Sequence, residues 1–319
     1  MKPFSRTLTS ALEGTASLTR ADSDYAPLRQ RYGHPHSCYL ELPGGVRLHY
    51  LDNAADEAAA HGRPTLVMVH GLLMDHYAWH AWYDCLGDAF RVITLDLPGH
   101  GLTAAPEYWP ATIESHARLL NDFVARLQLE RFTLIGHSLG GNIAWTFALA
   151  HPGRLDGLVL VAAAGWLDTR VQMQNLHSFL NFAGSAVGKA LLRKTNPEGL
   201  VHDGMNDTFA PHAVPEGIIE RYTALACAAG HRDILLGIAH SWGQRHLATE
   251  QRLAALDVPT LIMTGDSDRL VPAEHAYLFA DAIKGSELIV YPRTGHIPML
   301  TIPEASATDL RQWLVHSTR

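Results

Sequence analysis

A Gly-His-Ser-Leu-Gly pentapeptide at residues 136–140 constrains the fold of this chain more than any other feature. It follows the apolar run Phe-Thr-Leu-Ile at 132–135, which is typical of a buried strand, and it precedes a helix-like run at 142–150. Glycines two residues either side of Ser138 allow a sharp, strained turn, because a Cβ there would collide with neighbouring backbone. A serine in this strand–turn–helix context projects its hydroxyl from the sheet, so Ser138 is the candidate nucleophile.

A serine hydroxyl becomes a good nucleophile only when a base and an orienting acid lie beside it. Strand-like runs at 260–264 and 288–291 lead into loops that contain Asp268 and His296, respectively. Because the carboxyl ends of parallel strands share one edge of a sheet, these loops are expected near the serine. The predicted catalytic triad is therefore Ser138, Asp268 and His296.

Three carboxylates are candidates for the acid of this triad. Asp266 lies two residues before Asp268, and Asp168 follows the strand-like run at 158–161, where such folds also place an acid. The prediction prefers Asp268 and leaves Asp266 and Asp168 as alternatives.

Acyl transfer also needs backbone N–H groups that stabilise negative charge on the carbonyl oxygen. Leu139 directly follows the serine and begins the helix, where free N–H groups and the helix dipole favour an anion. The loop after the strand-like run at 65–69 offers a second donor, Leu72, next to a turn at Gly71. His70 in the same loop is expected to brace it through hydrogen bonds.

Size and charge narrow the classes of function. The chain has 319 residues, of which 47% are hydrophobic and 18% charged, so it can bury a large core. A net charge of −7 and the absence of a basic run give no footprint for nucleic acid. No run approaches the roughly 18 apolar residues of a membrane span, and residues 7–13 are too short and polar for a signal peptide. We expect no stable membrane insertion.

Cysteine and histidine spacing gives no reason to expect a metal or a disulfide framework. The three cysteines are far apart and odd in number. His76 and His80 are four residues apart and could share a helix face, but no third ligand has a spacing that completes a site. We therefore expect no metal, no cofactor and a cytoplasmic location.

Strand-like and helix-like segments alternate along most of the chain, which predicts a mostly parallel sheet of βαβ units. A hairpin is expected at 39–50, and further strands follow at 65–69, 92–95, 132–135, 157–161, 260–264 and 288–291. The alternation stops between about 165 and 253, where helix-like pieces at 171–182, 186–192, 216–229 and 234–242 occur without a convincing strand. Long connections of this kind are often lids over an active site.

The predicted organisation follows from this pattern. Residues 1–37 form an N-terminal extension with a possible amphipathic helix at 4–18. Residues 38–164 and 254–319 form the α/β core, and residues 165–253 form a helical cap.

Apolar side chains in the cap are candidates for a substrate pocket, because a pocket under a cap must be lined by some such set. The candidates are Trp166, Leu176 and Phe179, and they favour an apolar acyl or aryl substrate.

Taken together, the motifs resemble those of the capped α/β-hydrolase superfamily. The segments that carry the resemblance are Val69-His70-Gly71-Leu72, Asp96-Leu97-Pro98-Gly99-His100-Gly101, Gly136-His137-Ser138-Leu139-Gly140-Gly141, Asp268 with Pro272, and Gly295-His296-Ile297-Pro298. The resemblance covers about residues 39–316 and is greatest to serine esterases and lipase-like carboxylic ester hydrolases. It implies an α/β-hydrolase fold with an eight-stranded sheet, flanking helices and a helical cap insertion.

Departures from related enzymes narrow the implied chemistry. Haloalkane dehalogenases and epoxide hydrolases place aspartate where this chain has Ser138, and dehalogenases tend to have tryptophan in place of Leu139. Carbon–carbon bond hydrolases usually have Gly-Pro-Gly in the oxyanion loop and tryptophan after the catalytic histidine. This chain has Leu-Met-Asp at 73–75 and Ile297 at those places.

We therefore expect a serine hydrolase that cleaves small-molecule carboxylic esters through an acyl-enzyme intermediate. An acyltransferase, a perhydrolase or a carbon–carbon bond hydrolase could use the same triad, and a hydrolase-like ligand sensor could keep the same pocket. The sequence leaves open the natural ester, the oligomeric state and the role of residues 1–37.

Overall fold

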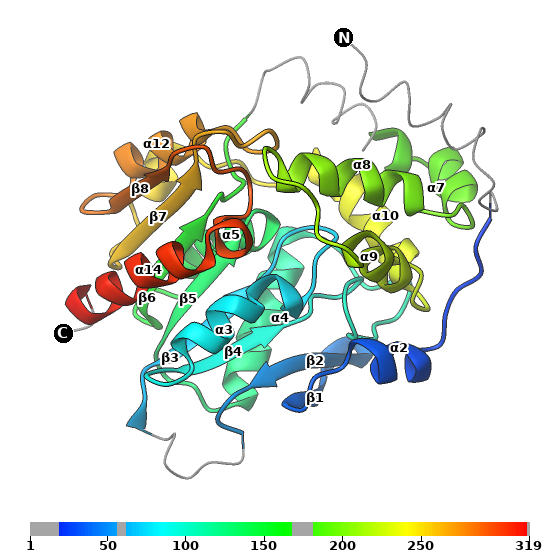
Figure 1. Ribbon diagram of the computed structural model, residues 1–319, viewed down its shortest axis with the longest axis horizontal. Coiled ribbons are helices and arrows are strands. Elements are labelled where there is room, and N and C mark those ends of the chain that lie inside the picture. The colour runs from blue at the N-terminus through cyan, green and yellow to red at the C-terminus, as the bar shows by residue number, and fades with distance from the viewer. Residues whose placement is uncertain (1–18, 56–61, 168–180, 318–319) are drawn as a thin grey trace.

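One eight-stranded sheet forms the centre of the protein (Figure 1). The structure, a computed structural model, describes residues 19–55, 62–167 and 181–317. Its strands are β1 (Ser37–Leu42), β2 (Val46–Asp52), β3 (Thr65–Val69), β4 (Arg91–Leu95), β5 (Phe132–His137), β6 (Leu155–Val161), β7 (Thr260–Gly265) and β8 (Glu287–Tyr291). The strand order is β1-β2-β4-β3-β5-β6-β7-β8.

Strand direction follows the length of the connections. The short turn at 43–45 makes β1 and β2 an antiparallel hairpin, and β2 is also antiparallel to β4. All other neighbouring strands are parallel and are joined by longer crossovers that contain helices. The predicted mostly parallel, eight-stranded sheet is confirmed.

Helices cover both faces of the sheet because its central strands are apolar on both sides. The helices of the core are η3 (His76–Trp79), α3 (His80–Leu86), α4 (Ile113–Arg126), α5 (Leu139–Ala150), α12 (Ala273–Ala282), α13 (Pro298–Thr301) and α14 (Pro303–Ser317). Along β3, Leu66 and Met68 pack with α3 and α14, whereas Val67 and Val69 pack with α4, α5 and α12. This alternation is the two-residue period of a strand.

Helix α4 shows how local sequence sets these elements. Thr112 accepts a hydrogen bond at its Oγ1 from the Ser115 backbone N–H, at 3.1 Å, and so caps the helix start. Ile113, Leu120 and Phe123 then recur at helical spacing and are buried against the sheet.

A group of helices lies between β6 and β7 in the chain. These are α7 (Ala186–Leu192), α8 (Glu198–Phe209), α9 (Ile218–Ala226), α10 (His231–Trp242) and the short α11 (Glu250–Leu253). We call α7 to α10 the cap helices; they lie together at the upper right of Figure 1. Within described residues 181–259 there is no strand, only isolated bridges. The predicted helix piece at 171–182 lies almost entirely outside the described residues.

The cap helices contact loops that follow the carboxyl ends of the strands. His231 of α10 lies 2.9 Å from the Thr103 carbonyl through its Nε2, and Ser241 donates to the Ala111 carbonyl at 2.7 Å. At the far end of α8, the Ala210 carbonyl packs so closely on Gly295 that a Cβ there would collide with it. The cap helices therefore adjoin the loops that hold the predicted triad.

The described part of the N-terminal extension runs along the cap helices. Helix α2 (Tyr25–Tyr32) packs on α9, and an isolated bridge joins Ser23 to Ala228. Asp22 pairs with Arg232 of α10. The helix predicted at 4–18 lies outside the described residues.

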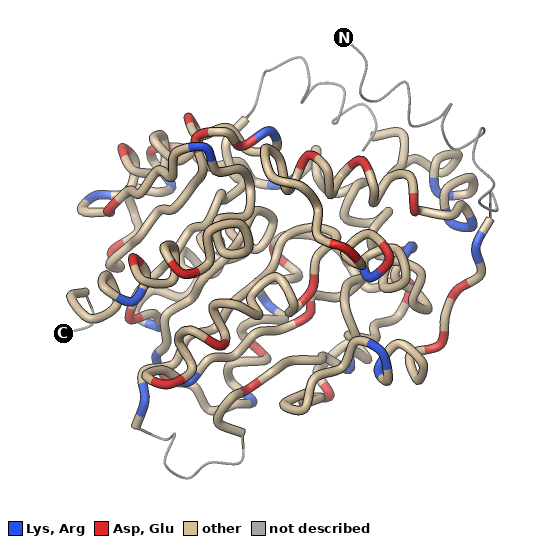
Figure 2. The backbone as a smooth tube through the Cα atoms, viewed as in Figure 1, with Lys and Arg blue, Asp and Glu red and all other residues tan. Residues whose placement is uncertain are grey.

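Charged side chains of both signs are interspersed over the chain (Figure 2). In the part of the chain that the structure describes, no helix combines the length and apolar character that a bilayer crossing requires.

Candidate active site

Ser138 occupies a strained turn between β5 and α5. Its φ of 53° and ψ of −113° lie outside the regions that a non-glycine residue readily adopts. The main chain holds this conformation: the Ser138 N–H donates to the Val161 carbonyl at 3.0 Å, and the Ser138 carbonyl accepts from the Ala164 N–H at 3.0 Å. The side chain is half-buried.

Both glycines that flank the serine are required by close backbone approach. A Cβ on Gly136 would collide with the Gly140 carbonyl, and a Cβ on Gly140 would collide with the Val69 carbonyl. The close backbone contacts that the sequence predicted at these two glycines are therefore present in the fold.

Asp268 and His296 form a buried hydrogen-bonded pair. His296 Nδ1 lies 2.7 Å from Asp268 Oδ2, and the two residues are 3% and 7% exposed. The other carboxylate oxygen, Oδ1, accepts from the backbone N–H groups of Leu270 at 2.8 Å and Val271 at 2.9 Å. The carboxylate thus keeps the Nδ1 proton of His296 in place and leaves Nε2 as a proton acceptor.

Asp266, the alternative acid that the structure describes, does not share this position. Asp266 is exposed, and its Oδ1 accepts from the Ser267 hydroxyl at 2.7 Å. Asp168 lies outside the described residues. Of the carboxylates that the structure describes, Asp268 is the one in contact with His296.

His137 fastens the histidine loop to the serine turn. Its Nε2–H donates to the His296 carbonyl at 3.0 Å, and the two imidazole rings are 4.6 Å apart. Burial, and then the proximity of His296, lower the pKa of His137 well below its ordinary value. His137 is therefore neutral and acts as a donor that positions the loop.

The loop at 70–75, which we call the oxyanion loop, lies beside Ser138. A Cβ on Gly71 would lie 3.1 Å from the Cβ of Ser138. His70 donates from Nδ1 to the Gly71 carbonyl at 2.7 Å and accepts at Nε2 from the Leu97 N–H at 3.0 Å. Burial lowers the pKa of His70, so the ring is neutral and can both donate and accept. The predicted bracing role of His70 is present.

Leu72 and Leu139, the predicted oxyanion donors, belong to the two segments that meet at Ser138. Leu72 follows Gly71 in the oxyanion loop, and Leu139 is the first residue of α5. The first N–H groups of a helix have no partner within the helix and point along its axis.

The predicted cap residues are only partly described. Trp166 packs edge-on against Phe279 of α12, with ring centroids 5.8 Å apart. Leu176 and Phe179 lie outside the described residues. A substrate-binding role for the three remains a prediction.

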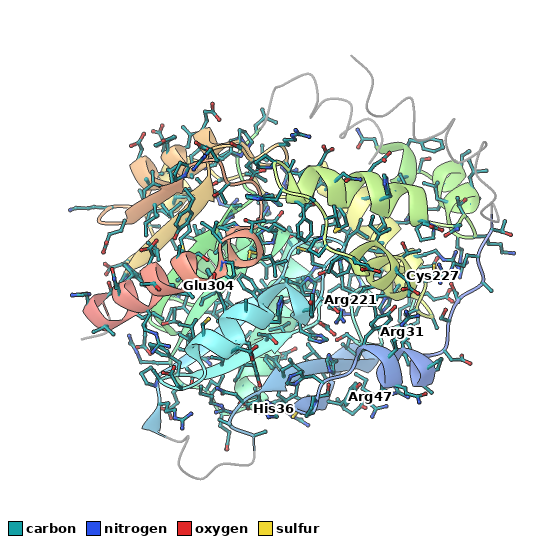
Figure 3. The ribbon with its side chains drawn as sticks, in the orientation of Figure 1. Arg31, His36, Arg47, Arg221, Cys227 and Glu304 are labelled. Carbon is teal, nitrogen blue, oxygen red and sulfur yellow. The ribbon has the colours of Figure 1, made fainter. Side chains whose placement is uncertain are left out.

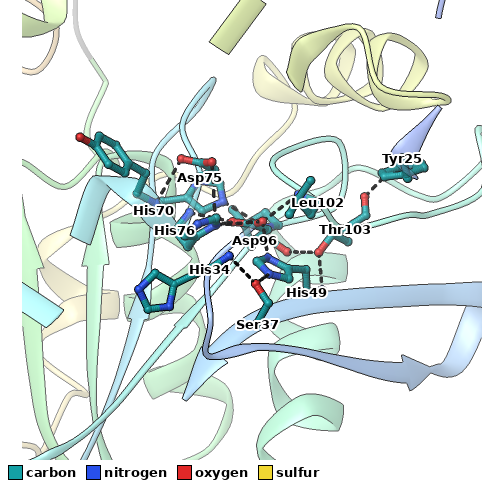
Figure 4. Close-up of polar contacts among 12 residues, drawn as sticks. Tyr25, His34, Ser37, His49, His70, Asp75, His76, Asp96, Leu102 and Thr103 are labelled. Carbon is teal, nitrogen blue, oxygen red and sulfur yellow. Dashed lines mark hydrogen bonds and ion pairs between the residues drawn. The ribbon is translucent and has the colours of Figure 1, made fainter. Parts of the chain in front are cut away.

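A buried carboxylate network beside the oxyanion loop was missed by sequence reasoning (Figure 4). Asp96 follows β4 and lies between His49 and His76. Its Oδ2 is 2.7 Å from His49 Nδ1 and accepts from the Leu102 N–H at 2.8 Å. Its Oδ1 accepts from the His76 backbone N–H at 2.7 Å and lies 3.1 Å from His76 Nδ1.

The network stabilises a carboxylate in the protein interior. Burial alone would raise the pKa of Asp96, but His76 and His49 outweigh it and hold that pKa well below the usual range. Burial likewise opposes protonation of His76, but Asp96 and Asp75 raise its pKa above the ordinary value. The two shifts describe one favourable interaction between a buried anion and its imidazole partner.

Within the described residues, His49, His76 and Asp96 are the one group whose residue types and spacing suit a metal ion. Both imidazoles direct Nδ1 to Asp96, and His76 Nε2 faces the guanidinium of Arg221 at 3.4 Å. The atoms that a metal would use are thus engaged in hydrogen bonds. His80, four residues after His76, is exposed, and its Nδ1 contacts the Tyr77 carbonyl at 2.9 Å.

Asp96→Asn should lower the free energy of unfolding by about 3–5 kcal/mol, because it removes a buried charge on which several donors converge. The Asp96 contribution is complete above its unfolded pKa of about 3.9 and is lost as pH falls through the folded pKa. The His76 contribution is complete below about pH 6.5 and is lost as pH rises through its raised folded pKa. In urea unfolding, the difference in free energy of unfolding between wild type and Asp96→Asn should therefore be largest between about pH 3.9 and about pH 6.5.

Asp156→Asn is the matched control for this measurement. Asp156 pairs with Arg131 at 2.6 Å, but both side chains are exposed. Its loss should cost about 1 kcal/mol or less. Equal losses for Asp96→Asn and Asp156→Asn would contradict the stabilising role of the network.

Comparisons with known proteins agree with this architecture. Residues 64–195 match the family model for the alpha/beta hydrolase fold. The 2-hydroxy-6-oxo-6-(2'-aminophenyl)hexa-2,4-dienoic acid hydrolase of Metapseudomonas resinovorans is 28% identical, over 85% of this chain and 90% of that protein.

Solved structures give the same result. A thermophilic esterase from Thermogutta terrifontis superposes with a TM-score of 0.71 at 26% identity, over 89% of this chain and 99% of the esterase. A membrane phospholipase A superposes with a TM-score of 0.75 at 23% identity, over 92% and 91% of the two chains, and shows the shared fold.

Proposed function

Because this chain has the alpha/beta-hydrolase fold, we propose that it hydrolyses carboxylic esters through an acyl-enzyme intermediate on Ser138. One observation carries the proposal: His296 lies 2.7 Å from Asp268 in a buried pair, and the loop of His296 is hydrogen-bonded through His137 to the strained turn of Ser138. Nucleophile, base and orienting acid are the parts that acyl transfer requires.

In the proposed reaction, Ser138 Oγ attacks the ester carbonyl while His296 Nε2 takes its proton. The N–H groups of Leu72 and Leu139 hold the oxyanion of the tetrahedral intermediate. His296 then protonates the departing alcohol, and the acyl group remains on the serine until a water molecule, activated by the same imidazole, releases the acid. Asp268 orients His296 and stabilises its protonated form without taking the proton.

Two considerations support an ester as the substrate. The Thermogutta terrifontis protein of the same fold is an esterase and aligns along almost its whole length. Apolar residues of the cap favour an acyl or aryl group of low polarity, as proposed for Trp166, Leu176 and Phe179. No step of this mechanism calls for a cofactor.

Carbon–carbon bond hydrolysis is the second candidate. The Metapseudomonas resinovorans relative is named as the hydrolase of a 6-oxo-hexadienoic acid, a compound that has no ester bond. Leu73, Met74 and Asp75 stand where such enzymes usually have Gly-Pro-Gly, and Ile297 stands where they have tryptophan. These differences favour the ester.

A panel of p-nitrophenyl esters of increasing acyl length, assayed beside a vinylogous 1,5-diketone acid, tests the proposal. We expect sustained turnover of the esters, a preferred chain length and little cleavage of the diketone. Preferential cleavage of the diketone would replace the first candidate with the second. Release of about one product per protein would point to a sensor instead.

The acceptor can be tested in the same assay. Product analysis with a competing short alcohol should give mainly the free acid. Predominant formation of a new ester would identify an acyltransferase and overturn the hydrolase assignment.

A further inference from the structure

A buried ion pair joins the cap helices to the oxyanion loop. Arg221 on α9 donates to Asp75 Oδ2 from Nε at 3.0 Å and from Nη2 at 2.5 Å. The Asp75 side chain is fully buried, and that of Arg221 is 12% exposed. Figure 3 places Arg221 just below α9, on the side of the core. Nothing in the proposed reaction uses this pair directly.

Aromatic rings enclose the guanidinium. Its central carbon lies 4.6 Å from the ring of Tyr77, which follows the oxyanion loop, and 5.1 Å from the ring of Tyr32 in α2. Cation–π contacts of this kind strengthen when water is excluded. Burial by itself would lower the pKa of Arg221, but the Asp75 carboxylate outweighs it and raises that pKa. Three segments that are distant in sequence therefore meet at one charge.

Asp75 fixes the end of the oxyanion loop. Its Oδ1 accepts from the Tyr77 N–H at 3.1 Å, and its carbonyl accepts from the Ala78 N–H at 2.9 Å, so Asp75 caps helix η3. Asp75 Oδ1 thus accepts from the backbone that follows the loop, while Oδ2 accepts from Arg221. One carboxylate therefore bonds both to the loop and to α9.

The oxyanion loop needs such support because its backbone is strained. Leu73 has a φ of 56°, a left-handed conformation that is costly for a leucine. It lies between Leu72, the proposed oxyanion donor, and Asp75. A conformation of this kind persists only where its surroundings hold it in place.

We propose that Arg221 is a positioning residue: through Asp75 it holds the oxyanion loop in the conformation that aims the Leu72 N–H at the oxyanion. The inference rests on the proposed ester hydrolysis for its catalytic consequence, but the tethering of the loop is a separate physical claim. Arginine suits this place because its planar fork offers two donors to one carboxylate oxygen while its flat face packs against tyrosine.

Two substitutions test the tether. Arg221→Met keeps the length of the side chain and removes its charge and donors. Asp75→Asn keeps the shape and the Oδ1 acceptor, and it provides a milder change if Arg221→Met does not fold. Each should lower kcat by about tenfold to a hundredfold with KM changed less than about threefold, because a misplaced oxyanion donor weakens the transition state more than the bound substrate. The double variant should be no worse than the more severe single variant.

Hydrogen exchange of the backbone amides at 71–75 gives a readout that does not depend on activity. We expect faster exchange there in both variants than in wild type. Arg31→Met is the control. Arg31 pairs at 2.8 Å with Glu220, the residue before Arg221, and the side chains of Arg31 and Glu220 are both exposed. It should leave kcat and the exchange at 71–75 unchanged.

Hydrogen exchange at 71–75 tests the tether, and kcat tests the positioning role. Unchanged exchange at 71–75 in folded Arg221→Met and Asp75→Asn would overturn the tether. Faster exchange with unchanged kcat would overturn the positioning role. Faster exchange in a protein whose wild type turns over no ester would support the tether and overturn the proposed function. An equal fall in kcat for Arg31→Met would show a general effect of cap charge and contradict the inference.

Discussion

Ser138→Ala should abolish ester hydrolysis, with a loss in kcat of about 10⁴-fold to 10⁶-fold relative to wild type. The variant lacks the oxygen that forms the acyl-enzyme, and the residual rate reflects substrate binding and the oxyanion donors alone. Alanine also suits the fold, because the N–H and carbonyl of residue 138 hold the turn and the hydroxyl does not. Thermal unfolding should therefore occur near the wild-type temperature.

Ser286→Ala is the matched control for Ser138→Ala. Ser286→Ala removes a hydroxyl that donates to the Ala280 carbonyl at 3.3 Å and precedes β8, at the opposite end of that strand from His296. It should keep wild-type turnover. Adding His296→Ala to Ser138→Ala should cost little more, because members of a triad act as a unit. Sustained hydrolysis by Ser138→Ala would rule out this serine as the nucleophile.

Asp268→Asn should lower kcat by about 10⁴-fold. Oδ1 of Asp268 accepts from the N–H groups of Leu270 and Val271, so an asparagine must place its oxygen there. Its NH2 group then faces His296 Nδ1, which must become an acceptor, and the proton moves to Nε2. In that tautomer the imidazole cannot take the serine proton. The activity should be measured together with the free energy of unfolding.

Asp266→Asn is the matched control, with the same substitution two residues away. Asp266 is exposed, and its carboxylate accepts a hydrogen bond from the Ser267 hydroxyl. Turnover by Asp266→Asn should therefore stay within about twofold of wild type. A large loss for Asp266→Asn with a small one for Asp268→Asn would transfer the role of the acid to Asp266.

The sheet and the elements beside the serine could be predicted because their signals are local. Each central strand is an apolar run, and β3 was predicted at its observed bounds of Thr65–Val69. Helix α8 was not predicted: it contains Gly199 and Gly204, and no side chain caps its start. Its four most buried side chains, Val201, Met205, Thr208 and Phe209, keep it in place by tertiary packing.

Contacts between distant residues account for what the sequence did not reveal. Asp96 and His49 are 47 positions apart, and Arg221 is 146 positions from Asp75. Neither pair has a spacing that suggests contact, because the topology of the sheet and the insertion of the cap bring them together. The contact between Asp268 and His296 likewise joins two loops that are 28 positions apart, and no spacing in the sequence distinguishes Asp268 from the other candidate acids.

The glycines around Ser138 have a consequence for how this protein could acquire new substrates. Gly71, Gly136 and Gly140 leave no space for even one methyl group without displacing neighbouring atoms. The backbone around the proposed nucleophile is thus fixed by steric contacts, and we expect a mutation at these glycines to impair the reaction before it alters substrate selectivity. Helix α8 of the inserted segment differs, because a Cβ on Gly199 or Gly204 would meet no atom within 4 Å. We therefore expect a shift in substrate range to arise from changes in the cap helices, while the glycines beside Ser138 are retained.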